Sequence, residues 1–256
     1  MKLLPSYLVH EESVAWTPIE IAGTTGNTWI KIFGRDPETQ ATAALIKYEK
    51  GCRIGESVSK VYSDTLYLSG KMSGDGKTFN KNSYAYRPAG TKSGPLVAEE
   101  ETVKLLITGG IDEICSDAPV FIQDCVAAIE KGSHMGNDWS KLTLRVDKEA
   151  ECVLVYQICH KAGVFNPGET WVHPHIEEAY FTECHGSSLD YLGEIEGHVA
   201  YTSPCYLYRP PGSRHGNAQY CPSTILCKYY STELAPDEIF KLNSKTQGIP
   251  KGHLVQ

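Results

Sequence analysis

Short strand-like runs, some with alternating apolar and polar residues, recur along most of the chain. They lie at residues 16–21, 29–33, 41–48, 58–61, 65–68, 83–86 and 102–108, and again at 142–146, 152–158, 170–173, 179–182, 188–192, 205–209 and 224–230. Successive side chains of a strand point to opposite faces, so this pattern predicts half-buried strands. Gly, Asp, Asn and Pro separate the runs, which together predict an all-β sandwich or barrel.

One segment near the middle has a different pattern. Asp117 is a predicted N-cap, with Pro119 in the first turn, and Val120 to Ile129 is the predicted body of a brief helix. Residues 132–138, which are rich in Gly, Ser, Asn and Asp, would end it. We interpret this segment as the connection between two halves of the chain.

An internal repeat supports two halves. The run Tyr84 to Gly94 matches Tyr206 to Gly216 at an offset of 122 residues (206 minus 84), with six of eleven positions identical. One unit used twice predicts two similar β-domains in tandem. We expect domains at residues 1–113 and 140–235, a linker at 114–139 and a tail at 236–256.

Composition and charge limit the class of protein. The net charge is −7 and no two Lys or Arg residues are adjacent, which gives no electrostatic support for a nucleic-acid partner. Pro5, His10 and two acids interrupt the apolar start of the chain, and no run reaches the length of a membrane span. We expect a cytoplasmic protein without a membrane partner. The odd, scattered set of nine cysteines predicts reduced thiols that pack as small hydrophobic side chains, as at Cys152, Cys159, Cys205 and Cys227.

The candidate chemistry lies in the second half. His173 and His175 stand two positions apart, so one strand would project both from the same face. Glu177 and Glu178 follow, and His215 lies 40 residues beyond His175. Three imidazoles and one carboxylate suit the divalent ions Fe, Mn, Ni, Cu, Co and Zn.

These residues resemble the two signature motifs of the cupin superfamily. The matching positions are Gly168, His173, His175, Glu178 and Gly186 in the first motif and Pro210, Gly212 and His215 in the second. The resemblance implies two tandem jelly-roll barrels, joined by a short, partly helical linker, with a metal in the interior of the second. Spacing alone does not decide whether Glu177 or Glu178 is the metal-binding carboxylate. Glu178 is favoured because it departs less from the motif and shares a strand face with Tyr180.

The first half lacks this ligand set. Ser93 stands where the second copy has His215, and the segment after Gly55 has no histidine. Aligning Gly55 with Gly168 gives a local offset of 113 residues, which places Asp64 opposite Glu177. The first domain is therefore expected to bind no transition metal at this position.

The strand spacing and the Tyr-x-Tyr-Arg-Pro-x-Gly motif also resemble the two-domain, anti-sigma-factor-type (ChrR-like) cupins. The resemblance implies a metal-dependent enzyme, with a non-haem Fe(II) dioxygenase acting on a small oxygen-chelating enol, diketone or hydroxyketone favoured. A non-redox Zn, Ni or Mn isomerase, decarboxylase or lyase and a metal-dependent ligand sensor are the alternatives. Glu178 and Tyr180 are the predicted catalytic residues, and Trp171 and Tyr180 the predicted pocket lining. A homodimer is expected.

Overall fold

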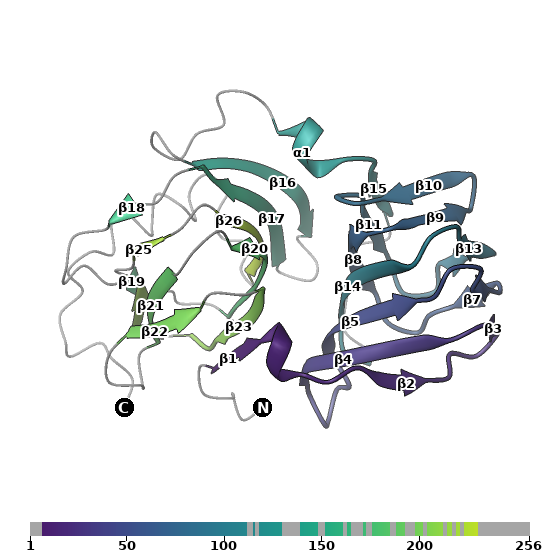
Figure 1. The fold of residues 1–256 in the computed structure, drawn as a ribbon, viewed down its shortest axis with the longest axis horizontal. Coiled ribbons are helices and arrows are strands. Elements are labelled where there is room, and N and C mark those ends of the chain that lie inside the picture. The colour runs from purple at the N-terminus through teal and green to yellow at the C-terminus, as the bar shows by residue number, and fades with distance from the viewer. Residues whose placement is uncertain are drawn as a thin grey trace. The chain divides into compact units, whose positions relative to one another are not determined.

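The structure is a computed structural model, and almost all of the elements that it describes are strands (Figure 1). It describes residues 7–111, 115, 118–129, 139–147, 152–160, 163–164, 171–172, 176–184, 188–192, 198–201, 204–211, 214–216, 219–220 and 223–229. The chain divides into two compact units. The N-terminal unit is Val14–Ala128, and the C-terminal unit combines Met1–Ser13 with Ile129–Gln256.

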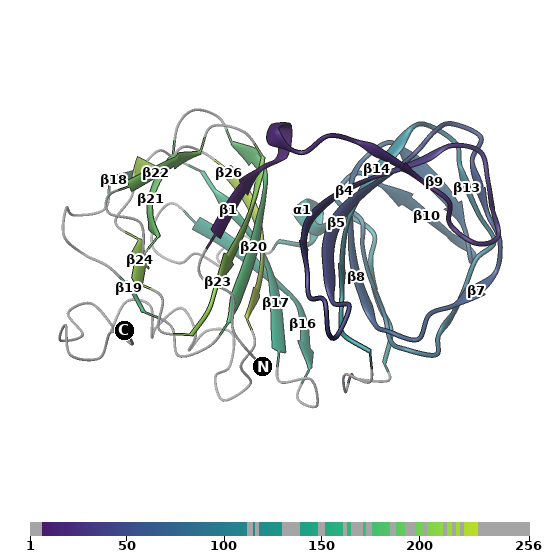
Figure 2. The same cartoon turned by 90° about the horizontal axis from the view of Figure 1, so that it is seen from below.

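Two main sheets form the N-terminal unit. The larger has the order β15-β11-β8-β14-β5-β4-β2, comprising β15 (Val120–Ile122), β11 (Tyr84–Arg87), β8 (Ser63–Ser69), β14 (Thr102–Thr108), β5 (Thr42–Tyr48), β4 (Thr28–Arg35) and β2 (Thr17–Ile19). The smaller has the order β10-β9-β13-β6-β3, comprising β10 (Lys77–Asn80), β9 (Lys71–Gly74), β13 (Leu96–Ala98), β6 (Arg53–Ile54) and β3 (Thr24–Thr25), and β12 (Lys92–Ser93) pairs with β7 (Ser57–Val58). Figure 2 shows the two main sheets as opposite walls of a barrel.

The core of this unit defines the inner face of the larger sheet. Tyr67 of β8 and Ala85 of β11 belong to one buried cluster with Met72, Phe79 and Leu96 of the smaller sheet. The rings of Tyr67 and Phe79 stack with centroids 4.8 Å apart. Because strand positions alternate, the odd-numbered positions from 63 to 67 face inward and the even-numbered ones face outward.

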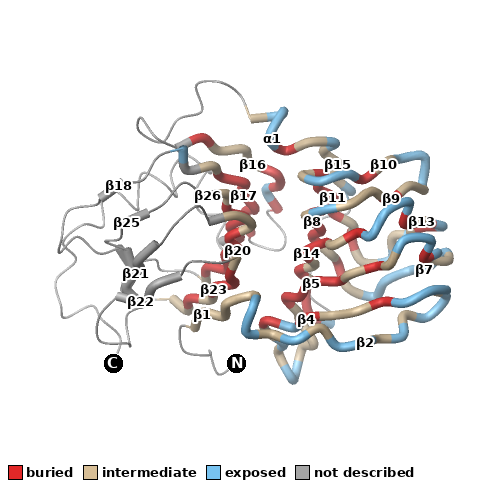
Figure 3. Tube along the Cα trace, in the orientation of Figure 1, coloured by how far each residue is buried: buried red, intermediate tan, exposed pale blue. Residues whose placement is uncertain are grey.

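Both faces of the larger sheet are buried along its central strands. Tyr67 on the inner face is 0% exposed and Leu66 on the outer face is 1% exposed. Figure 3 shows the buried positions concentrated in β5, β8 and β14 of this unit. A strand buried on both faces has a nearly continuous apolar sequence, as in Ala43 to Ile46.

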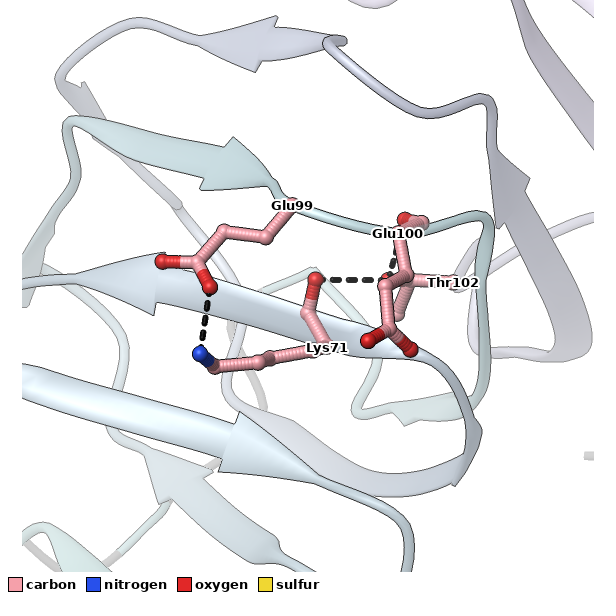
Figure 4. Close-up of polar contacts among 4 residues, drawn as sticks. All are labelled: Lys71, Glu99, Glu100 and Thr102. Carbon is pink, nitrogen blue, oxygen red and sulfur yellow. Dashed lines mark hydrogen bonds and ion pairs between the residues drawn. The ribbon is translucent and has the colours of Figure 1, made fainter.

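The turn from β8 to β9 packs closely against the start of β14 (Figure 4). Gly70 has φ +75°, and a Cβ added there would lie 2.0 Å from the Glu101 carbonyl oxygen. The Thr102 hydroxyl donates to the Lys71 carbonyl at 3.1 Å, and the Lys71 ammonium forms an exposed ion pair with Glu99 at 2.6 Å. This ion pair raises the pKa of Lys71 and lowers that of Glu99. Because the backbones of Gly70 and Glu101 approach each other this closely, position 70 requires glycine.

The C-terminal unit repeats this plan. Its larger sheet has the order β1-β23-β20-β26-β17-β16, comprising β1 (Tyr7–His10), β23 (Cys205–Arg209), β20 (Glu177–Cys184), β26 (Ser223–Tyr229), β17 (Cys152–Cys159) and β16 (Trp139–Asp147). A second sheet has the order β19-β24-β21-β22, comprising β19 (Trp171–Val172), β24 (Arg214–Gly216), β21 (Ser188–Leu192) and β22 (His198–Tyr201), and β18 (Gly163–Val164) pairs with β25 (Gln219–Tyr220). The sequence-based expectation of two β-domains matches this arrangement.

The structure draws the domain boundaries differently from the sequence. The strand β1 adds to the edge of β23, with Leu8 paired to Leu207, so the first residues of the chain complete the C-terminal sheet. In return, β15 from the predicted linker pairs with β11 of the N-terminal unit. The boundaries at 113 and 139 are therefore replaced by divisions near residues 13 and 128. The predicted tail at 236–256 lies outside the described residues.

The predicted helix at Val120 to Ile129 is mostly wrong. Val120–Ile122 is strand β15, and only Cys125–Ala128 forms a helix, α1. Asp124 caps it, because its carboxylate accepts from the backbone N–H groups of Val126 and Ala127 at 2.9 and 3.1 Å. Asp117, the predicted cap, lies outside the described residues.

The structure confirms the prediction for three of the cysteines. Cys152, Cys205 and Cys227 are buried thiols in strands. The side chain of Cys159 lies outside the described residues. No helix in the described ranges is long and apolar enough to cross a bilayer.

Candidate metal centre

The two candidate carboxylates begin strand β20 and point to opposite faces of the larger C-terminal sheet. Glu177 pairs with Arg209 of β23 and Tyr229 of β26, while Glu178 pairs with Tyr208 and Lys228. Both side chains are buried, at 4% and 9% exposure. Because adjacent strand residues alternate, only one of the two can face the interior of the barrel.

The register of the N-terminal unit identifies the face. There, Arg87 pairs with Ser63 and Asp64 pairs with Tyr86. Since the repeat matches Arg87 with Arg209, Ser63 corresponds to Glu177 and Asp64 corresponds to Glu178. The offset in this strand is 114 residues (178 minus 64), which corrects the sequence alignment that placed Asp64 opposite Glu177.

This correspondence puts Glu178 on the outer face. A buried hydrogen bond repeats with it: the Tyr84 hydroxyl donates to Asp64 Oδ1 at 2.6 Å, and the Tyr206 hydroxyl donates to Glu178 Oε1. Burial, followed by the Glu178 charge, raises the pKa of Tyr206 well above its ordinary value. The same two causes raise the pKa of Tyr7, on β1, to about 12. The prediction that Glu178 is the metal-binding carboxylate does not fit this arrangement.

Glu177 lies on the inner face. Its Oε2 forms a buried ion pair with Arg209 Nη1 at 2.7 Å, in which both side chains are 6% exposed. Arg87, which corresponds to Arg209, has its guanidinium 5.7 Å from the centroid of the Phe79 ring in the core of the N-terminal barrel. Arg87 also forms an ion pair, with Asp75 at 3.5 Å.

Tyr180 shares the face of Glu178, as predicted, but that face is the outer one. Its hydroxyl donates to Glu11 Oε2 at 2.8 Å, and Tyr180 pairs with Tyr206 in the ladder. The geometry therefore gives Tyr180 no place in the lining of the barrel interior. Sequence reasoning did not identify the Tyr206 hydroxyl as the partner of Glu178, although the repeated Tyr84 and Tyr206 were the available signal.

The histidines are described only in part. His173 and His175 lie outside the described residues. The backbone of His215 belongs to β24 and pairs with Trp171 of β19 and with Leu192 of β21. The strand that carries Trp171 and Val172 ends immediately before His173, so the backbone brings position 215 beside the segment that leads into the His-x-His motif.

The residues fit a divalent metal by their donor chemistry. The inner face offers one buried carboxylate, Glu177, and the strand pairing brings the His215 backbone beside Trp171, which precedes His173 by two positions in the sequence. Imidazole and carboxylate are suitable ligands for Fe, Mn, Ni, Cu, Co and Zn. Among the described residues, which include neither His173 nor His175, no three metal-binding side chains cluster together.

Comparison with known proteins identifies the fold. No family model matches the chain, and no curated protein matches it. A solved structure of a candidate dioxygenase from Nostoc punctiforme has a TM-score of 0.71 at 14% identity, covering 90% of this chain and 84% of that one. The HEPD of Streptomyces albus, solved with 2-hydroxyethylphosphonate and Fe(II) bound, has a TM-score of 0.63 at 9% identity, covering 97% and 80%.

A barrel protein named for the fold itself is also similar. The cupin 2 conserved barrel domain protein of Leptotrichia buccalis has a TM-score of 0.56 at 10% identity, covering 90% of this chain and 99% of that one. Identities this low establish a common fold and leave the activity open. The chain is all-β and folds as two tandem cupin barrels.

Proposed function

We propose that the C-terminal barrel binds one divalent metal through His173, His175, His215 and Glu177, and that the protein is a metal-dependent cupin enzyme. The observation that carries the proposal is the buried inner-face carboxylate of Glu177, in the barrel whose sequence holds the histidines. The N-terminal barrel has Ser63 at the corresponding position and no histidine in its motif segment. The resemblance to anti-sigma-factor-type cupins is part of this proposal and rests on sequence motifs.

Arg209 and the neighbouring apolar residues prepare Glu177 for this role. The ion pair at 2.7 Å holds the Glu177 carboxylate in one orientation, and a carboxylate has two oxygens, so one group can serve an arginine and a metal. Ala179, Phe181 and Leu207 share the inner face and are at most 4% exposed. They exclude water, which strengthens electrostatic interactions at the site.

The favoured chemistry is oxygenation of a small organic molecule. A divalent metal held by imidazole and carboxylate groups supplies Lewis acidity and, as Fe(II), redox chemistry with O2. Small organic molecules that chelate a metal through two adjacent or β-placed oxygens, in enol, diketone or hydroxyketone form, are the substrate class proposed. Two of the similar structures are a candidate dioxygenase and an Fe(II) protein, and for this reason we favour iron.

A matched pair of substitutions tests the metal site. Glu177→Gln removes the inner-face carboxylate and is expected to lose most of the bound metal. Glu178→Gln changes the outer face and is expected to keep it. Elemental analysis of protein purified without a His-tag or added metal makes the comparison, with about one metal per chain expected in the unsubstituted protein.

The histidines provide the second comparison. His175→Ala and His215→Ala are expected to lose the metal while the barrel stays folded. His160→Ala is the control, because His160 is exposed and its ring contacts Ser140 Oγ at 2.8 Å. Equal metal content in the two glutamate variants, or full content in both histidine variants, would contradict the proposed ligands. Oxygen uptake after anaerobic loading with Fe(II), over a panel of diketones and enols, then tests the oxygenase.

A further inference from the structure

A cluster of polar side chains lies in the interior of the N-terminal barrel, which has no metal-ligand motif. Its members come from five segments that face the core: Tyr48 of β5, Tyr67 of β8, Asp75 of the β9–β10 turn, Arg87 of β11 and Lys104 of β14. Tyr48 and Tyr67 belong to the buried core cluster. We call these five residues the inner polar cluster.

Lys104 is the deepest charged group of the inner polar cluster. It pairs with Ile46 and Tyr67, both inner-face residues, and is 8% exposed. Its amine lies 5.1 Å from the centroid of the Tyr48 ring. Within the described residues, the amine makes no hydrogen bond and no ion pair. Burial, with a smaller contribution from the Arg87 charge, lowers the pKa of Lys104 to about 7.

Arg87 and Asp75 form the more exposed end of the cluster. Their ion pair measures 3.5 Å, and the side chains are 16% and 22% exposed. Asp75 also accepts from the backbone N–H of Gly94 at 3.0 Å, which fixes the β9–β10 turn. The Arg87 guanidinium lies over Phe79, so it reaches from the turn toward the core. Solvent therefore reaches this end of the cluster, whereas Lys104 is more deeply buried.

The charges of the inner polar cluster do not balance when Lys104 is protonated. Two cations face one carboxylate, which leaves one positive charge inside a barrel. Tyr67 adds a polar group, because its buried hydroxyl makes no hydrogen bond of good geometry among the described residues, although it lies close enough to Arg87 for that guanidinium to offset part of the rise that burial causes in its pKa. A buried charge and a buried hydroxyl with poor hydrogen-bond geometry are both costly, and a bound anion would satisfy both.

We propose that the N-terminal barrel is a binding site for a small monocarboxylate, held between Lys104 and Arg87 with the Tyr67 hydroxyl as a further donor. One negative charge balances the cluster, and the apolar core around Phe79 and Met72 suits a short carbon chain. The proposal is independent of the metal site, because it concerns the other barrel. It gives the metal-free copy of the fold a ligand of its own.

Protonation of Lys104 governs binding in this site. An anion binds the protonated amine better, so affinity is highest below about pH 7 and falls as the pH rises above the pKa of free Lys104. The other titratable groups near it are Arg87, Asp75, Tyr48, Tyr67 and Cys52. Burial raises the pKa values of Tyr48, Tyr67 and Cys52, so these groups stay neutral across this range.

Isothermal titration calorimetry of the full chain with acetate, propionate and pyruvate tests the site. Acetamide, which is neutral and similar in shape, is the ligand control. At least one acid is expected to bind at pH 6 and to bind about tenfold more weakly at pH 8.5, while acetamide gives no heat.

Two variants locate the site. Lys104→Met and Arg87→Met are each expected to weaken acid binding by about tenfold or more, since each removes a charged hydrogen-bond donor. Lys50→Met, at an exposed position of the same unit, is the matched control and is expected to bind normally. Thermal melts confirm folding of each variant. Absence of binding by all three acids at pH 6, or equal affinity in the Lys104 and Lys50 variants, would overturn the proposal.

Discussion

A buried tyrosine hydroxyl bonded to a carboxylate occurs in both units of the chain. Tyr84 donates to Asp64 in the N-terminal unit, and Tyr206 donates to Glu178 in the C-terminal unit. The first pair exists in a barrel whose motif segment lacks histidine, so this interaction does not need a metal. Glu178 is best understood as part of the outer face, which leaves Glu177 for the interior.

Removing the hydroxyl tests this interpretation. Tyr206→Phe leaves the Glu178 carboxylate without its buried donor and is expected to lower the free energy of unfolding by about 1–3 kcal/mol. Metal content should not change. Urea unfolding monitored at several wavelengths makes the measurement, with Tyr84→Phe as the matched change in the other unit. Unaltered stability with lost metal would assign Tyr206 and Glu178 to the metal site instead.

Lys104 predicts a pH dependence of stability. Its pKa is about 7 in the folded protein and near 10.5 when unfolded, so the unfolded chain binds more protons between these values. Stability from this group therefore rises as the pH increases from about 7 toward 10.5. Lys104→Met should abolish that rise, as measured by urea unfolding at several pH values. The same pH dependence in the variant would show that other groups cause it.

The sequence could identify the candidate ligands but not the face of each. Adjacent acids such as Glu177 and Glu178 are distinguished only by strand register. The alignment at Gly55 and Gly168 gives an offset of 113 residues, the strand gives 114, and the tyrosine motif gives 122. The offset changes because the segments between these positions differ in length in the two copies. A difference of an odd number of residues exchanges the two faces of the next strand.

At the level of elements, long alternating runs were predicted well and short strands were not. The runs at 41–48 and 102–108 became β5 and β14 with almost the same bounds. By contrast, β9, β10 and β13 of the smaller sheet were missed, because they are three or four residues long, and β9 and β10 also contain Gly or Lys. Tertiary pairing, and not local pattern, defines such strands.

The turn at Gly70 gives a prediction with an internal control. Gly70→Ala introduces a Cβ 2.0 Å from the Glu101 oxygen, whereas Gly51→Ala meets nothing within 4 Å. Both glycines have positive φ, so the Gly51 change is expected to cost only about 1–2 kcal/mol of backbone strain. Gly70→Ala should cost clearly more, because the β8–β9 turn must also move. Equal losses in thermal or urea unfolding would contradict the packing of this turn.

For the whole molecule, the repeat predicted two domains but not the exchange of segments at their boundaries. The sequence predicted no strand at the interrupted apolar start of the chain, since nothing local shows that Tyr7–His10 pairs with residues about 200 positions later. Sheet edges also leave homodimerisation as a prediction, which light scattering can test. The edge strands of the larger sheets are β15 and β2 in the N-terminal unit and β1 and β16 in the C-terminal unit.

Deleting residues 1–10 measures the contribution of β1. The deletion exposes the edge of β23 and removes Tyr7 from the neighbourhood of Glu178 and Tyr206. Amide hydrogen exchange is expected to show lost protection in Cys205–Arg209, with β5 and β14 of the N-terminal unit unchanged. If the exchange of Cys205–Arg209 stays the same, β1 contributes nothing to the stability of this sheet.

The position of β1 also affects how the chain is made. A ribosome synthesises this strand before its partner β23, which emerges about 200 residues later, after roughly ten to forty seconds at about 5–20 residues per second. The N-terminal unit can fold during that interval, whereas β1 has no β23 to pair with until that strand has been synthesised. On a crowded polysome, the β23 of a neighbouring nascent chain presents an identical edge. The misassembled product expected of this protein is therefore a pair of molecules that have exchanged their first strands.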